Sequence, residues 1–208
     1  MTQIEALAKL RGMLNESGTG GFYSDAMLYS FMDNGQRDII NLAWSKQQMM
    51  RKVDPDYRSD LLIALEVTAS GGVSDQTYEV NLPVDFLFSV SALIGIDNAP
   101  EVTAYQLSYS RFKQLEGNQF TKATAKSPKY YISGNELGFK PDYTDVGSVI
   151  HIYIKTPDAI NSTQDFTLGE ECRLAIIWFA HSYALIQDNR FQEATESRLT
   201  AINLIKDL

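Results

Sequence analysis

The ends of the chain place apolar side chains at the three- and four-residue spacing of amphipathic helices. At the N-terminus, this spacing predicts a short helix over residues 3–14, ended by the glycine-rich stretch 17–21. Ser24 is a suitable N-cap for a second, long helix that runs to about residue 51, and Pro55 ensures that it stops. The apolar positions of the two helices are Ile4, Leu7, Leu10 and Leu14, then Leu28, Phe31, Met32, Ile39 and Leu42.

The middle of the chain changes to the alternation of apolar and polar residues that is typical of β-strands. The predicted strands are residues 61–68, 77–82, 86–96, 130–132, 136–139 and 149–155, with a short helix at 108–117. We expect the first two strands to form a hairpin across residues 69–75, and residues 130–139 to form a second hairpin.

Helical spacing returns at residues 168–187, and Asp188 or Asn189 is expected to cap a last helix. Strands grouped between helices indicate an α+β fold. The predicted architecture is an antiparallel helical bundle from the N- and C-terminal helix pairs, residues 1–58 and 168–208. An antiparallel β-rich module, residues 59–167, is inserted between them.

Charge and composition narrow the classes of function. The 208 residues carry a net charge of −8, and the densest basic stretch, Lys122, Lys126 and Lys129, is too sparse to predict a nucleic-acid groove. Sequence-specific DNA binding is therefore disfavoured, although an acidic surface suits a channel through which DNA slides. One cysteine, Cys172, fits a reducing compartment, and no apolar run approaches the ~20 residues of a membrane span. We expect no membrane association. We also expect that the protein is made in a cytoplasm, without a signal peptide.

No residue pattern in the chain predicts an active site. Cys172 and His181 are too far apart on one predicted helix to form a nucleophile–base pair, and His151 lies in a strand. The glycines at 18–21 and 71–72 lack the Lys-Ser or Lys-Thr of a phosphate-binding loop. The acidic pairs Asp54/Asp56, Asp142/Asp145 and Glu170/Glu171 are explained as turn residues or as partners of a helix dipole. We predict no catalytic residue, no metal site and no cofactor.

Four segments carry a resemblance to a known family. They are residues 34–41 (NGQRDIIN), 78–86 (YEVNLPVDF), 128–137 (PKYYISGNEL) and 152–157 (IYIKTP), followed by the alanine-bearing terminal helices. In this order they resemble the head-to-tail adaptor (connector) proteins of tailed phages, and are similar to the tail-tubular adaptors of short-tailed phages. The resemblance spans nearly the whole chain as a pattern of elements.

The resemblance implies a structural virion protein without enzymatic activity. Such a protein forms a ring, dodecameric in this family, that docks on the portal protein and carries downstream neck or tail proteins. DNA passes through its channel without specific binding. The implied location is the virion neck, between capsid and tail, after assembly in the host cytoplasm.

Seven apolar residues, four towards helix ends and three along the C-terminal helix, are predicted to lie in protein interfaces. A cyclic ring needs two different complementary faces on each subunit, and the core of one bundle cannot cover every apolar position. The predicted interface residues are Trp44, Met49, Met50, Phe191, Leu199, Ile202 and Ile205. The loops 69–76 and 117–128 are expected to adapt to neighbouring subunits.

Three other functions stay open from the sequence. A stopper or tail-completion protein would share β-rich surfaces but often has sixfold rather than twelvefold symmetry. A tail-associated carbohydrate-binding or cell-wall-cleaving protein would show an exposed aromatic platform beside two carboxylates. A cellular helical regulator is disfavoured, because the β-rich module occupies nearly half the chain.

Overall fold

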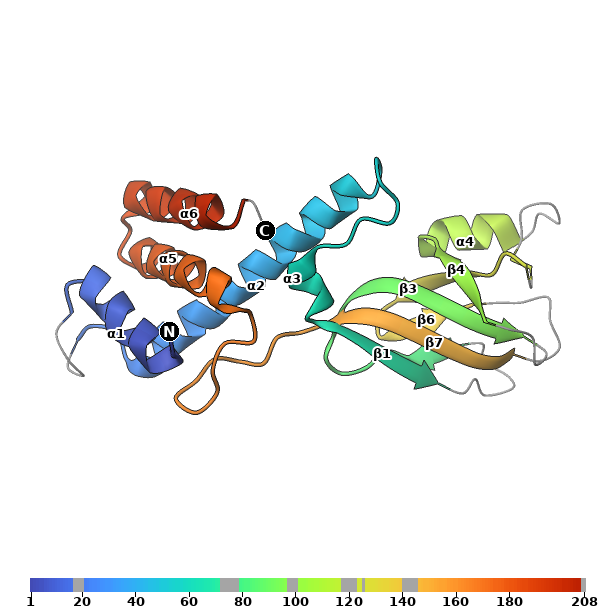
Figure 1. The fold of residues 1–208 in the computed structure, drawn as a ribbon, viewed down its shortest axis with the longest axis horizontal. Helices are drawn as coiled ribbons and strands as arrows, with labels where there is room; N and C mark the ends of the chain where they lie inside the picture. The colour runs from blue at the N-terminus through green and yellow to red at the C-terminus, as the bar shows by residue number, and fades with distance from the viewer. Residues whose placement is uncertain are drawn as a thin grey trace. The chain divides into compact units, whose positions relative to one another are not determined.

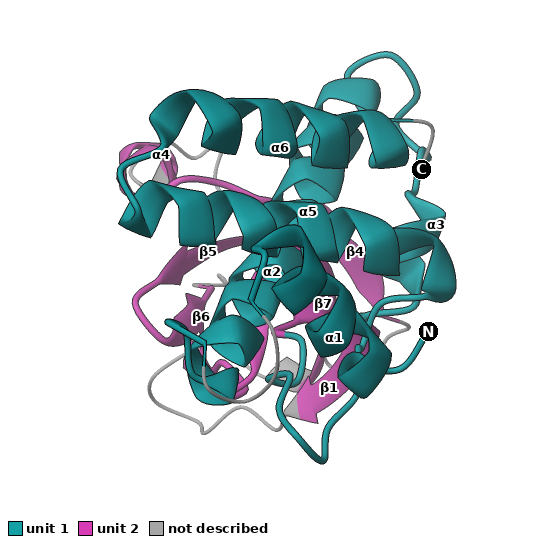
Figure 2. Ribbon diagram, turned by 90° about the vertical axis from the view of Figure 1, so that its left-hand side faces the viewer, with its two compact units in different colours: residues 1–65, 157–208 teal, residues 66–156 magenta. Residues whose placement is uncertain are grey.

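The computed structural model describes residues 1–16, 21–71, 79–96, 101–116, 123–124, 126–139 and 146–206. These residues form a mixed α+β fold of six helices and one seven-stranded sheet (Figure 1). The chain divides into two compact units: a helical unit, residues 1–65 and 157–208, and a β unit, residues 66–156 (Figure 2). The N- and C-terminal segments therefore belong to the same unit.

The described residues of the helical unit form five helices. They are α1 (Gln3–Met13), α2 (Asp25–Met50), α3 (Asp60–Ile63), α5 (Glu170–Gln187) and α6 (Phe191–Ile205). The predicted cap of α2 is confirmed, because the Ser24 hydroxyl accepts a hydrogen bond from the Met27 amide. The apolar pattern places Leu28, Phe31, Ile39, Leu174 and Ile177 in the core. All of them are buried except Leu174, which is half-buried.

Helix α5 lies against α1, α2 and α6 and is the centre of the helical unit. Its approach to α2 is close at Gly35, where a side chain would lie 2.9 Å from both the Ile176 carbonyl oxygen and Phe179 Cβ. The neighbouring Gln36 is fully buried, and its side chain accepts hydrogen bonds from the amides of Thr167 and Leu168. One turn of α2 thus holds both α5 and the segment that leads into it.

The β unit is a single sheet with one helix. Its elements are β1 (Glu66–Gly71), β2 (Glu79–Asn81), β3 (Phe86–Ile96), β4 (Val102–Gln106), α4 (Tyr109–Glu116), β5 (Lys129–Ser133), β6 (Glu136–Gly138) and β7 (Val146–Lys155). The strand order is β1-β7-β3-β4-β5-β6-β2. The core cluster consists of Ala92, Ile94, Ala104, Tyr130, Leu137, Phe139 and Val149. Apolar positions of both long strands and of the β5–β6 hairpin therefore share one interior.

Two of the sequence predictions for the β unit are confirmed. The third predicted strand coincides with β3, Phe86–Ile96. The hairpin predicted over residues 130–139 is formed by β5 and β6, which pair in antiparallel register. Gly134, between these strands, has a φ of +60°, a left-handed conformation that glycine adopts readily.

Other predictions for this region are wrong. The strand predicted at 61–68 is split, because residues 60–63 form α3 and bury Leu62 before β1 begins at Glu66. The hairpin across residues 69–75 is not formed, since β1 pairs with β7 and β2 pairs with β6. Strand β4 was not predicted, and its pairing with β5 is parallel, so the module is not wholly antiparallel. The strand pairings depend on partners distant in sequence, which a local pattern does not encode.

Replacing Gly35 with Ala is expected to lower the free energy of unfolding by about 1–3 kcal/mol, although alanine favours helix more than glycine does. The added methyl group would meet the backbone of α5 at 2.9 Å, and a backbone carbonyl cannot move aside cheaply. The matched control is Gly12→Ala in α1, where nothing lies within 4 Å of the new Cβ. That variant should be neutral or more stable by up to about 1 kcal/mol. Urea denaturation measures both, and equal effects would contradict the close α2–α5 contact.

Candidate functional site

The predicted interface residues fall into two groups in the structure. Met49 is 62% exposed at the end of α2, and on α6 Phe191 and Leu199 are 59% and 55% exposed. Met50 is also exposed, whereas Trp44, Ile202 and Ile205 are half-buried. The seven residues therefore differ in exposure, and Ile202 and Ile205 line a hollow of the helical unit.

That hollow is an apolar groove between α2 and α6, which we call the α2–α6 groove. Its volume is about 110 Å³. It is lined by Ile39, Leu42, Ala43, Lys46, Leu61, Ile202, Ile205 and Lys206. A hollow of this size is suited to an apolar side chain rather than to a drug-sized ligand.

Polar contacts fix the positions of the two helices that form the groove. On the N-terminal side of Ile39 and Ile202, Arg198 lies 3.0 Å from the Asp38 carboxylate. The Tyr183 hydroxyl of α5 donates to the same carboxylate at 2.9 Å. Toward the other end, the Lys46 ammonium donates to the Lys206 carbonyl oxygen at 3.0 Å. The apolar lining therefore lies between two polar bridges, the first of which also includes Tyr183 of α5.

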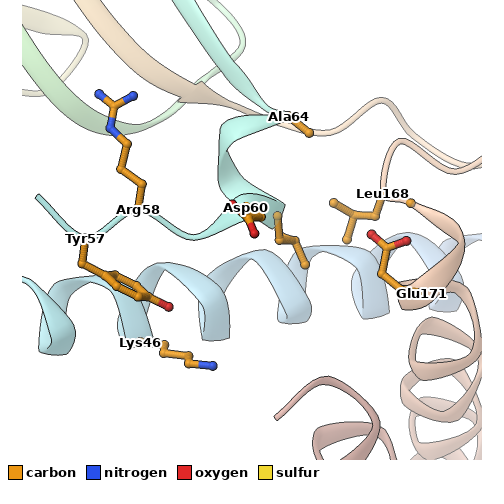
Figure 3. Close-up of a pocket in the computed structure, with 9 residues that line it drawn as sticks. Lys46, Tyr57, Arg58, Asp60, Ala64, Leu168 and Glu171 are labelled. Carbon is orange, nitrogen blue, oxygen red and sulfur yellow. The ribbon is translucent and has the colours of Figure 1, made fainter. Parts of the chain in front are cut away.

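A second hollow in the helical unit adjoins the groove and shares Lys46 and Leu61 with it. Its volume is about 400 Å³, and its other lining residues are Tyr57, Arg58, Asp60, Ala64, Leu168, Gly169 and Glu171 (Figure 3). Figure 3 shows the Arg58 side chain pointing away from α2. The lining mixes charges of both signs, so this pocket favours neither anions nor cations. It was not predicted, because the segment between α2 and β1 was assigned to a turn and a strand.

The segment that forms one wall of this pocket is tied to α2 by hydrogen bonds. The Gln47 side-chain oxygen accepts from the Ser59 amide at 2.8 Å, and Arg51 donates to the Tyr57 carbonyl oxygen at 3.1 Å. Gln47 and Ser59 are both buried. The wall is therefore part of the packed helical unit.

The histidines lie in buried polar contacts. In the β unit, His151 Nε2 is 3.0 Å from the Ser89 hydroxyl, which is itself 2.8 Å from the Tyr130 hydroxyl. The His151 ring also packs against the rings of Phe86 and Tyr153. A serine beside a histidine is the first part of a nucleophilic pair, but here the hydroxyl is shared with a buried tyrosine. This arrangement supports the core of the sheet.

The pKa values of the buried groups agree with a role in the core. Burial lowers the pKa of His151 to about 4 and raises the pKa of the Cys172 thiol to about 12, so both stay neutral near pH 7. His181 is half-buried, lies 2.9 Å from the Ser197 hydroxyl, and has a pKa that burial lowers. Among the described residues, no group of three or more His, Cys, Asp and Glu side chains is placed to hold a metal ion. In the same part of the chain, no helix is both long and apolar enough to cross a membrane.

Several predicted loop features lie outside the described residues. They are most of the loops 69–76 and 117–128, the glycines 18–20 and Gly72, and the pair Asp142/Asp145. Asp54 and Asp56 are exposed in a turn in which the Asp56 amide donates to the Asp54 carboxylate. Glu170 opens α5 and accepts from the N-terminal ammonium at 3.1 Å. These two acidic pairs are thus turn and helix-start residues, as predicted.

Replacing His151 with Gln is expected to weaken the dependence of stability on pH. The folded protein binds a proton at His151 only near pH 4, whereas an unfolded chain binds it near pH 6.5. The unfolded chain therefore holds more protons between these values, and stability falls as the pH drops from about 7 to about 4. The difference corresponds to about 3 kcal/mol. Urea denaturation at pH 7 and at pH 4.5 measures the loss in each protein.

An NMR titration of the same pair of proteins provides the control. The ring resonance that disappears in the His151→Gln variant should titrate near pH 4 in the original protein. A titration near pH 6.5, or an unchanged pH dependence in the variant, would show that the ring is not buried in solution.

Comparison with known proteins does not assign a family. No protein-family model matches the chain, and no curated protein matches it.

Proposed function

We propose that the protein is a structural virion protein, the head-to-tail adaptor of a tailed phage. It forms a ring beneath the portal protein, joins the capsid to downstream neck or tail proteins, and lets DNA pass through the channel. The observation that carries the proposal is the α2–α6 groove, together with the apolar side chains that protrude elsewhere on the same unit.

A closed ring of identical subunits requires two different surfaces that complement each other. The α2–α6 groove provides a concave apolar surface, with Leu42, Ile202 and Ile205 in its lining. Met49, Phe191 and Leu199 provide protruding apolar side chains. Apolar side chains that fill pockets on a partner contribute much of the energy of protein interfaces. The combination supports assembly by surface shape.

The helical unit is suited to act as the rigid part of this assembly. We propose that the N- and C-terminal helix pairs work as one antiparallel bundle, a finer arrangement than the mixed α+β fold. The close contact between Gly35 of α2 and Phe179 of α5 supports it, as does the position of α6 beside α5 in Figure 1. A bundle held in this way keeps the groove in a fixed shape when subunits join.

The net charge is consistent with passage of DNA. At −8, the whole subunit repels phosphate on average, so DNA would slide through a ring of such subunits. In this proposal the protein works in the virion neck and assembles in the host cytoplasm. It needs no cofactor and carries out no bond-making step.

Replacing Leu42 or Leu199 with Asp is expected to prevent incorporation into particles. Leu42 lines the groove and Leu199 is exposed on α6, so a charge at either position opposes burial against a neighbour. Both side chains are partly exposed in the single subunit, and the thermal unfolding temperature should change little. The assay produces particles from a phage genome lacking the gene and supplies each variant in trans, then counts tailed particles.

The control is Ala8→Asp, which adds the same charge at an exposed position of α1. This variant should support assembly at the original level. If Leu42→Asp and Leu199→Asp assemble as well as the control does, these surfaces are not interfaces and the proposal fails on them.

The copy number in intact particles is expected to be twelve, in a ring between the portal and the tail. Cryo-electron microscopy of virions measures it. Six copies would indicate a stopper or tail-completion protein, and absence of the protein from the neck would contradict the adaptor function itself.

A further inference from the structure

The described part of the β unit carries a concentration of positive charge that the net charge conceals. Residues 102–134 contain five of the chain's 18 Lys and Arg residues but only one of its 26 acidic residues. Four of the five cations are on described residues: Arg111, Lys113, Lys126 and Lys129. We call Arg111, Lys113 and Lys129, with Tyr105 and Tyr109, the basic face.

Strand pairing and the packing of α4 bring the members of the basic face to one side of the sheet. Strands β4 and β5 are parallel, with Tyr105 opposite Lys129, and side chains at opposite positions point to the same side of a sheet. Tyr131, two residues beyond Lys129, points to that side as well. The rings of Tyr109 and Phe112 on α4 lie 5.0 Å and 4.8 Å from the Tyr131 ring. Helix α4 therefore covers the same side of the sheet on which Tyr105 and Lys129 lie.

The Arg111 and Lys113 side chains are exposed, and Lys129 is half-buried. Tyr105 is 62% exposed and Tyr109 is 49% exposed. The Lys113 ammonium lies over the Tyr109 ring, 5.7 Å from its centroid. At 100° per residue, Arg111 and Lys113 lie on opposite flanks of α4, on either side of the buried Phe112. The charges are thus distributed across the width of the helix and extend to β5.

We propose that the basic face binds the phosphate backbone of nucleic acid without sequence preference. Clustered Lys and Arg displace counterions from phosphates, which is the main source of sequence-independent affinity. Exposed aromatic rings beside such cations offer stacking surfaces for unpaired bases. The acidic residues Glu79 and Glu136 lie beyond Tyr131, whose hydroxyl donates to Glu79 at 3.2 Å, and they limit the face on the β6–β2 side.

An acidic protein surface is the alternative partner for a cationic face. Lysine is depleted at protein–protein interfaces, whereas arginine and tyrosine are enriched. Two of the three cations in the basic face are lysines. A long lysine side chain acts as a point charge, which suits phosphates that vary in position better than it suits a fixed protein surface. The composition therefore favours nucleic acid.

This inference goes beyond the proposed adaptor function, in which DNA passes a subunit that repels it on average. It adds a local contact through which each subunit touches the backbone. The two are tested separately, because binding is measured on the purified protein and assembly is measured in particles. If the purified protein does not bind nucleic acid, the proposed role of the helical unit in assembly is unaffected.

The test is fluorescence anisotropy of the purified protein with a labelled single-stranded oligonucleotide and with its duplex. We expect both to bind at 50 mM salt. With three neutralised phosphates and a slope of about −0.9 for each, affinity for the duplex should fall roughly 40-fold by 200 mM salt. The double variant Lys113→Gln, Lys129→Gln should weaken binding about tenfold or more and reduce the salt slope by about 2. Tyr105→Ala should weaken binding of the single strand by about tenfold and leave the duplex unchanged.

The matched control is Lys9→Gln, Lys52→Gln, which removes two exposed lysines from the helical unit. It changes the net charge equally and should keep the original affinity. The proposal is overturned if neither nucleic acid binds at 50 mM salt, or if the control weakens binding as much as the double variant. It is also overturned if the double variant changes self-association in sedimentation and leaves DNA binding intact, because the face would then be a contact between copies.

Discussion

The contact between α2 and α5 at Gly35 is the constraint on which the helical unit depends. Only a residue without a side chain lets the two helices approach so closely, because a Cβ would meet the α5 backbone at 2.9 Å. The side chain of the next residue, Gln36, accepts hydrogen bonds from the amides of Thr167 and Leu168, which lie 131 and 132 positions later in the chain. This single turn therefore joins the two ends of the sequence, and the β unit becomes an insertion between them.

Much of this fold follows from local pattern. The helical period predicts α2, α5 and α6, and alternation predicts β3 together with the β5–β6 hairpin. The failures share a physical cause. The apolar run at residues 61–65 fits either a strand or a helical turn, and burial of Leu62 in the helical unit decides for the turn. The hairpin predicted across residues 69–75 failed because β1 pairs with β7, whose paired residues lie about eighty positions away in the chain.

The assembly surfaces could be predicted only in part, for a related reason. A helical period identifies which positions are apolar, but it does not say which of them the protein's own core will cover. On α6, the same pattern contains the protruding Leu199 and the groove-lining Ile202 and Ile205. Leu61 completes the groove from α3, and no signal in its own segment indicates this, since the groove exists only once α2 and α6 lie side by side.

The basic face arises from the feature of the sheet that local pattern missed. Parallel strands cannot be joined by a tight hairpin and need a long crossover connection. The connection between β4 and β5 contains α4, which carries Arg111 and Lys113, and it returns to the sheet at Lys129, opposite Tyr105. Cations that are spaced too widely along the chain to predict a binding surface are thereby brought to one side of the sheet. A net charge of −8 describes the average of the molecule, whereas what a polyanion meets is determined by topology.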